Sequence, residues 1–177
     1  MTETAEGTPL WKPSEKLKEN ARIFDYMKWL RDEKDLSFED YNDLWEWSVT
    51  DLEGFWASVW EYCGVDASKF YERVLAKRGM PGAEWFSGAE LNYAEHVLKH
   101  AKGRLDEPAI LHQSEVRSLG EVSWGELREK TVALAAGLKE MGVQRGDRVA
   151  AYLPNVPEAV IALLACASIG AVWSSCS

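Results

Sequence analysis

The chain is 177 residues long, 46% hydrophobic and 28% charged, which is ordinary usage for a globular protein and does not favour disorder. It carries 20 Lys and Arg against 29 Asp and Glu, and this net charge of −9 argues against a nucleic-acid partner, because phosphate binding rests on excess positive charge. The cysteines Cys63, Cys166 and Cys176 are odd in number and lack CxxC spacing, so we expect free thiols and a cytoplasmic protein.

Two stretches bear on membrane attachment, and neither predicts it. The opening residues, MTETAEGTPLWKPSEK, lack the apolar core of a secretory signal. The most apolar run, residues 159–173, includes Ser168 and Gly170 and is only 15 residues long, whereas a membrane span needs about 20. We therefore predict a buried core segment and no membrane partner.

The first hundred residues are predicted to be all-helical, with residues 1–20 as an extended segment and residues 21–103 as a helical region. After Thr50, apolar side chains recur every three or four residues, which predicts a helix with one buried face: Leu52, Phe55, Trp56, Val59, Trp60 and Cys63. Helical spacing also favours a core position for five clustered tryptophans, with a binding surface as the alternative: Trp29, Trp45, Trp47, Trp56 and Trp60. The nine acids from Asp32 to Glu53 are expected on the solvated side.

Short motifs predict where helices begin and end. Five polar residues are each followed three positions later by an acid, as in a capping box: Ser37, Thr50, Asn92, Ser123 and Asn155. Four glycines stand where these helices are expected to end in a left-handed cap: Gly64, Gly103, Gly142 and Gly170.

From residue 104 onward the pattern alternates strands and helices. The expected elements are a strand hairpin, then helix, strand, helix and strand, over residues 108–113, 120–124, 126–141, 146–154, 155–169 and 171–175. Such alternation is typical of a parallel sheet. The predicted fold class is therefore α/β, a helical N-terminal extension followed by the first βαβ units of an incomplete larger domain.

The residue patterns assign no catalytic residue and no metal ligand. His96 and His100 have the i, i+4 spacing of a zinc-binding helix, but the intervening VLK holds no acid and no third ligand is evident. The segment GVQRGDRV, residues 142–149, precedes a strand, which is the wrong order for a phosphate loop. No nucleophile and base can be paired from spacing.

Residues 123–177, from SWGELREKT to GAVWSSCS, closely resemble the opening of the acyl-CoA synthetases of the adenylate-forming superfamily. Four earlier segments resemble the superfamily members that activate acetoacetate: LWKPS (10–14), LWEWSV (44–49), FWASVWEYC (55–63) and MPGAEWFSGAELNYAEHVL (80–98). The resemblance identifies residues 21–103 as the acyl-CoA synthetase N-terminal region and residues 104–177 as the truncated start of the AMP-binding α/β domain.

The resemblance implies a ligase that works in two steps. Acetoacetate would attack the α-phosphorus of ATP to give an acyl-adenylate and pyrophosphate, and the thiol of coenzyme A would then displace AMP. Joining two anions implies Mg²⁺ and a donor-rich phosphate loop in the parent enzyme.

The family's catalytic motifs do not occur in these 177 residues: a Ser/Thr/Gly-rich loop ending in Lys, an aromatic–Thr–Glu motif, a ribose-binding Asp and a C-terminal Lys. We therefore expect an inactive N-terminal fragment that binds ATP, Mg²⁺ and CoA poorly, and we assign no cofactor-binding residue. In acetyl-CoA synthetase relatives the loop just beyond Ser177 helps line the CoA nucleotide site. Residues 174–177 themselves are interpreted as the end of a strand packed in the sheet.

Two alternatives remain open. The parent could be another short-chain acyl-CoA synthetase, acting on acetate, propionate or a longer keto acid, or the region could be a non-catalytic interaction module that uses its acidic, Trp-rich helices. In every case, an uncovered sheet edge and the apolar helix of residues 156–169 predict self-association.

Overall fold

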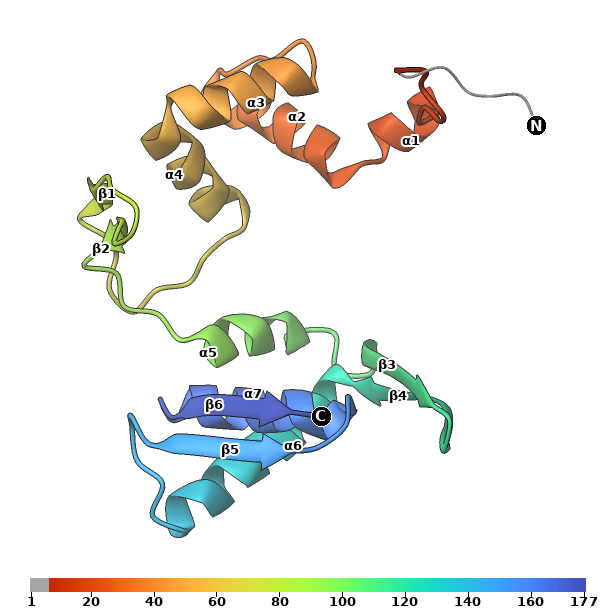
Figure 1. Cartoon of the computed structure of the whole chain (residues 1–177), viewed down its shortest axis with the longest axis vertical. Coiled ribbons are helices and arrows are strands. Elements are labelled where there is room, and N and C mark those ends of the chain that lie inside the picture. The colour runs from red at the N-terminus through yellow and green to blue at the C-terminus, as the bar shows by residue number, and fades with distance from the viewer. Residues whose placement is uncertain (1–6) are drawn as a thin grey trace. The chain divides into compact units, whose positions relative to one another are not determined.

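The computed structural model describes residues 7–177, so the first six residues of the expected extended segment lie outside it. The chain divides into two compact units (Figure 1). Unit 1 contains the residues up to Val65 together with Glu72–Ser87, and unit 2 contains Asp66–Tyr71 together with Gly88–Ser177. The domain limits predicted at residues 20 and 103 stay a prediction.

Unit 1 begins with four helices, α1 (Glu15–Glu19), α2 (Arg22–Lys34), α3 (Tyr41–Thr50) and α4 (Leu52–Tyr62). The helix α1 corrects the expectation of extended chain over residues 15–19. An aspartate caps the N-terminus of each of α3 and α4. The Asp40 side chain accepts from the N–H groups of Asn42 and Asp43 at the start of α3, and the Asp51 side chain accepts from the Gly54 N–H at the start of α4. The starts predicted at Ser37 and Thr50 are therefore wrong, because an aspartate closer to the first turn caps each helix.

Aromatic side chains form most of the core of unit 1. Tyr26, Leu30 and Leu44 are buried, and partly buried neighbours that include Trp29 and Trp47 pack around them. Trp60 is also buried, whereas Trp45 remains 55% exposed and Trp56 40% exposed. The core prediction for the tryptophans is thus correct at three positions and wrong at Trp45 and Trp56.

A β-hairpin within unit 1 contradicts the prediction of an all-helical first hundred residues. Strands β1 (Arg73–Lys77) and β2 (Glu84–Ser87) pair antiparallel. The segment between them contains Gly79, Pro81 and Gly82, which interrupt a helix strongly. The flanking residues include β-formers such as Val74, which is buried.

Unit 2 alternates helices and strands, as expected from residue 104 onward. Its elements are α5 (Tyr93–Leu98), the 3₁₀ turn η1 (Lys99–Ala101), β3 (Pro108–Ser114), β4 (Arg117–Ser123), α6 (Trp124–Glu140), β5 (Arg148–Tyr152), α7 (Pro157–Ser168) and β6 (Val172–Cys176). Strands β3 and β4 form the predicted hairpin, and β5 and β6 pair in parallel around α7 as a βαβ unit. The fold class predicted from the sequence is confirmed.

The expected continuous sheet is wrong in one respect. Within residues 7–177, β3–β4 and β5–β6 are separate two-stranded sheets. Strand β4 leads directly into α6 through the capping box of Ser123 and Glu126, and α6 then packs on α7. Strand β5 pairs with β6 and not with β4.

Helix boundaries in unit 2 follow the predicted signals with one exception. Asn92 and Ser123 cap α5 and α6 as expected. At α7 the cap is Val156 and not Asn155, because a residue before proline avoids helical geometry and Pro157 suits the first helical position. All four predicted C-terminal glycines have positive φ: Gly64, Gly103, Gly142 and Gly170.

The helices α6 and α7 cover one face of the β5–β6 pair (Figure 1). Buried residues of both helices pack with Ala171 against Val149 and Trp173: Ala135, Leu138, Ala165 and Cys166. On the opposite face, Tyr152 is 84% exposed and Val172 is 54% exposed. This face of the parallel pair is uncovered among the described residues.

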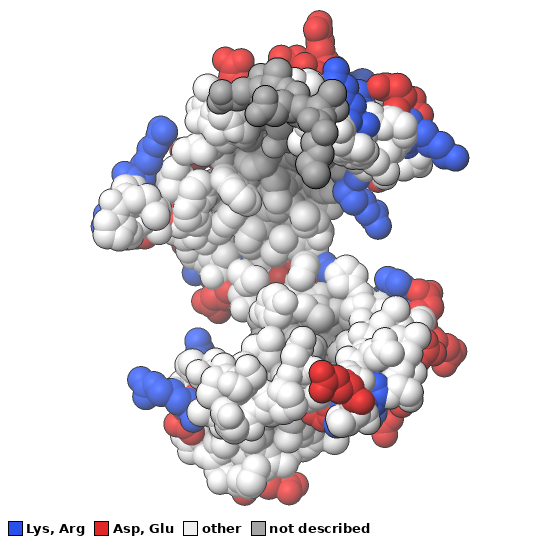
Figure 2. Space-filling model, turned by 45° about the vertical axis from the view of Figure 1, so that its right-hand side comes forward, with Lys and Arg blue, Asp and Glu red and all other residues white. Residues whose placement is uncertain are grey.

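Charged side chains of both signs are spread over the surface with uncharged surface between them (Figure 2). The nine acids from Asp32 to Glu53 are all exposed, which confirms the prediction of a solvated acidic side. Among residues 7–177, no helix combines the length and the hydropathy that crossing a bilayer requires.

Candidate functional site

The carboxyl ends of β5 and β6 lie side by side and define a candidate site in unit 2. Tyr152 pairs with Cys176, and the Leu153 N–H donates to the Cys176 carbonyl at 3.0 Å. Helix α7 begins at Pro157, a short loop after β5. In open parallel sheets, ligands bind at this edge, where strand ends and helix N-termini supply backbone donors.

A small hollow of about 170 Å³ lies between β3 and the start of α7. Its lining comes from residues 110–113 of β3, Asn155–Pro157 and Val160. Its polar side chains are His112, Gln113 and Asn155. Ligand pockets for drug-sized molecules usually exceed about 300 Å³, so this hollow has room only for a small group.

An ion pair fixes the β3–β4 hairpin against α7. The Arg117 guanidinium donates to both carboxylate oxygens of Glu158, at 3.1 and 3.0 Å. The hydrogen bond from Arg117 holds the pKa of the Glu158 carboxyl below its ordinary value. Glu158 also lies in the first turn of α7, where a negative charge complements the helix dipole. The pair joins residues 41 positions apart, so no spacing pattern in the sequence signals it.

The side-chain amide of Asn92 connects α5 to α7, because its carbonyl and its NH₂ group each form hydrogen bonds. The side-chain carbonyl accepts from the N–H groups of Ala94 and Glu95 at 2.9 and 3.2 Å, and the NH₂ group donates to the Ala167 carbonyl at 2.9 Å. A single side chain therefore begins one helix and satisfies a carbonyl near the end of another, which orients α5 on the βαβ unit.

The histidine pair has a structural environment. The His96 and His100 rings are 6.0 Å apart, and the Asp66 N–H donates weakly to Nδ1 of His96 at 3.4 Å. Burial, with a further contribution from the Lys99 charge, lowers the pKa of His96. Among residues 7–177, no three or more His, Cys, Asp or Glu side chains gather as a metal site.

The serines at the end of the chain lie in and just after β6, where a strand was predicted. Ser174 and Ser175 pair with Ala150 and Ala151 of β5, and their side chains are exposed, as is Ser177. The pairing agrees with a strand end, but the exposure shows that the serines are not packed between layers. A role for this edge in binding the CoA nucleotide stays a prediction.

Comparison with known proteins supports the resemblance read from the sequence. Residues 41–97 match the family described as acetyl-coenzyme A synthetase N-terminus, and residues 97–177 match the family described as AMP-binding enzyme. Proteins named acetoacetyl-CoA synthetase are 43% identical in Danio rerio, over 99% of this chain, and 36% identical in Rhizobium meliloti (strain 1021), over 96%. The solved structure of acetoacetyl-CoA synthetase from Streptomyces lividans superimposes with a TM-score of 0.90 at 47% identity over 96% of this chain.

The chain spans only 26% of the length of each of these three proteins. Since the matches to these three proteins cover 96–99% of this chain, the resemblance to the adenylate-forming acyl-CoA synthetases is confirmed across nearly all of the 177 residues. The carboxyl edge of β5–β6 and its supports, Asn92 and the Arg117–Glu158 pair, lie within the matched region.

Proposed function

We propose that these residues are the N-terminal part of an acetoacetate–CoA ligase of the adenylate-forming superfamily. The observation that carries the proposal is the match to proteins named acetoacetyl-CoA synthetase, which covers nearly the whole chain in sequence and in fold. The match includes the helical and hairpin region of unit 1 and is not confined to the AMP-binding segment of unit 2.

The complete protein would convert acetoacetate, ATP and CoA to acetoacetyl-CoA, AMP and pyrophosphate. A carboxylate oxygen of acetoacetate forms a bond to the α-phosphorus of ATP as pyrophosphate leaves. The CoA sulfur then bonds to the acyl carbon as AMP leaves. The first step joins two anions, so Mg²⁺ supplied with ATP would be needed to spread their charge.

The proposed contribution of this chain is a scaffold, and no catalytic residue, metal ligand or cofactor-binding residue is assigned within it. The βαβ unit β5–α7–β6 supplies a strand edge whose position is fixed by α5 and by the β3–β4 hairpin. By themselves, the 177 residues are expected to bind ATP, Mg²⁺ and CoA poorly and to form no adenylate.

We further propose a cytoplasmic location and small-molecule partners only, without nucleic acid or membrane. The net charge of −9 and the three free cysteines support this proposal. The open face of β5–β6 supports self-association of the isolated chain, because parallel sheets are almost always covered on both faces.

The test is a chimeric enzyme. The matching quarter of the Streptomyces lividans protein is replaced by these 177 residues, and exchange of pyrophosphate into ATP is measured with acetoacetate, acetate and propionate. We expect exchange with acetoacetate, and none from the 177 residues alone. A second chimera replaces only the segment matching residues 88–177, in case the larger exchange disturbs folding. A chimera that unfolds cooperatively yet shows no acetoacetate-dependent exchange contradicts the proposal.

A further inference from the structure

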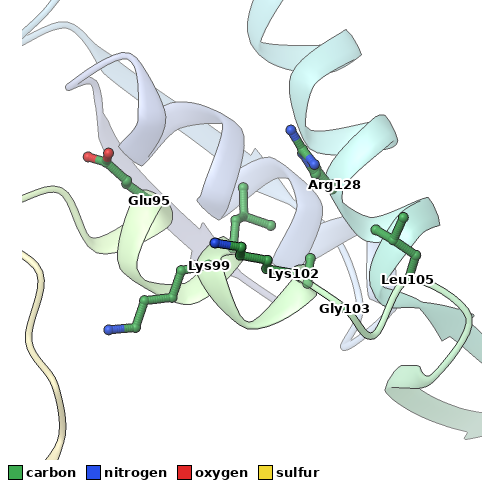
Figure 3. Close-up of a pocket in the computed structure, with 8 residues that line it drawn as sticks. Glu95, Lys99, Lys102, Gly103, Leu105 and Arg128 are labelled. Atoms are coloured by element: carbon green, nitrogen blue, oxygen red, sulfur yellow. The ribbon is translucent and has the colours of Figure 1, made fainter.

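A second hollow in unit 2 lies away from the carboxyl edge of β5–β6. It has a volume of about 580 Å³ and is lined by α5, η1, the loop that follows η1 and one side chain of α6 (Figure 3). This volume falls within the range of small-molecule pockets, about 300–1,000 Å³.

The lining combines an apolar surface with several positive charges. Leu98, Ala101 and Leu105 supply the apolar part. Lys99, Lys102 and Arg128 supply three cations against a single acid, Glu95. Figure 3 shows Arg128 reaching from α6, while Lys99 and Glu95 extend at the other end of the hollow. An excess of positive charge is unusual in a chain whose net charge is −9.

Two of these cations are not neutralised by the protein. Lys99 pairs with Asp66 at 3.1 Å, and the neighbouring Arg104, outside the lining, pairs with Glu107 at 2.8 Å. In contrast, the side-chain nitrogens of Lys102 and Arg128 form no ion pair or hydrogen bond with any group of residues 7–177. A guanidinium with all its donors available fits a carboxylate through two parallel hydrogen bonds.

We propose that this hollow is an accessory site for a small organic anion with an apolar tail, of the class of medium-chain carboxylates. The carboxylate lies between Lys102 and Arg128, and the tail lies on Leu98 and Leu105. A four-carbon keto acid is too short to cover most of this apolar surface, which would stay exposed to water. The site is therefore distinct from one for acetoacetate. The inference does not depend on the proposed ligase activity.

The experiment is a titration of the 177-residue chain with octanoate, followed by backbone amide chemical shifts. We expect saturable shifts confined to α5, η1 and the first half of α6. The neutral 1-octanol, inorganic phosphate and acetoacetate are titrated in parallel, and each is expected to bind at least about fivefold more weakly than octanoate, because each lacks either the charge or the tail.

Two variants test the cations. Arg128→Gln and Lys102→Gln are each expected to weaken octanoate binding by about fivefold, which is the effect of one partly exposed ion pair. Lys139→Gln is the matched control, because Lys139 lies on the same helix outside the hollow and is also exposed. Shifts scattered over the chain, equal binding of 1-octanol, or an equal loss in Lys139→Gln would each overturn the proposal. Equal binding of phosphate would also overturn it, by showing a site for the charge alone.

Discussion

Gly170 ends α7 in a conformation that a side chain resists, and its replacement by alanine should destabilise unit 2. Its φ is +75°, and its carbonyl accepts from the Gly146 N–H at 2.9 Å, which joins the turn before β5 to the turn before β6. A Cβ at this position would lie 2.9 Å from Cγ of Arg145, closer than ordinary contact. The left-handed backbone costs an L-residue about 1–2 kcal/mol, and the Arg145 side chain is flexible enough to move away. We therefore expect Gly170→Ala to lower the free energy of unfolding by about 1–2 kcal/mol.

Gly137 provides the matched control in the same unit. It lies within α6, and an added Cβ would meet nothing within 4 Å. Alanine is favoured over glycine inside a helix by about 0.5–1 kcal/mol, so Gly137→Ala should raise the free energy of unfolding by that amount. Both variants replace one α-hydrogen of a glycine by a methyl group, yet they are expected to change the free energy of unfolding in opposite directions.

The assay is urea unfolding followed by far-ultraviolet circular dichroism, with midpoint and slope compared among the variants. Adding Arg145→Ala to Gly170→Ala separates the steric cause from the backbone cause: because the Arg145 side chain can already move away, removing it should restore little of the lost stability, and the backbone cost should remain. If Gly170→Ala unfolds at the wild-type midpoint, or shifts it in the same direction as Gly137→Ala, the reasoning about the left-handed cap is refuted.

Three further outcomes can be measured. The Tyr26 hydroxyl and Ser58 Oγ are 2.6 Å apart in the core of unit 1, so Tyr26→Phe and Ser58→Ala should each cost about 1 kcal/mol; additive costs in the double variant would show that the bond contributes nothing. The pKa of Glu158 is lowered by its hydrogen bond from Arg117, so the pair stabilises the fold above the ordinary pKa near 4.5 and its contribution is lost as pH falls through the lower folded value. Arg117→Gln should therefore destabilise by up to about 1 kcal/mol at pH 7 and by less in acid, and a pH-independent loss would contradict this. Sedimentation at high concentration should show self-association that Tyr152→Lys reduces, whereas a monomeric wild-type chain would exclude the open sheet face as an interface.

Local signals in the sequence predicted local structure well. The starts of α5 and α6 were predictable because Asn92 and Ser123 act on N–H groups two or three residues away. The glycines at helix ends were predictable for a similar reason, since a left-handed cap is a property of one residue. The cap of α7 was predicted one residue too early, at Asn155. Pro157 restricts the backbone of the residue before it, so Val156 is the cap.

Contacts between distant residues had no sequence signal. The hairpin β1–β2 lies in a region whose neighbours are helical, and its pairing depends on a turn that the helical interpretation overlooked. The hydrogen bond from Asn92 to Ala167 and the Arg117–Glu158 pair span 75 and 41 residues. These contacts orient α5 and the β3–β4 hairpin on the candidate site, which is why the sequence predicted the strands but not how their edge is supported.

The open face of β5–β6 shows how sequence and structure complement each other. Alternation along β5 leaves Arg148, Ala150 and Tyr152 exposed while Val149 and Ala151 are half-buried. The sequence predicted a strand here, and the packing of α6 and α7 decides which face is covered.

The most direct test of the central claim is the rate of pyrophosphate exchange by the Streptomyces lividans enzyme carrying these 177 residues in place of its own matching segment. The account predicts exchange that depends on acetoacetate and exceeds the exchange with acetate or propionate. A folded chimera that exchanges with acetate or propionate but not with acetoacetate, or with none of the three acids, would contradict it.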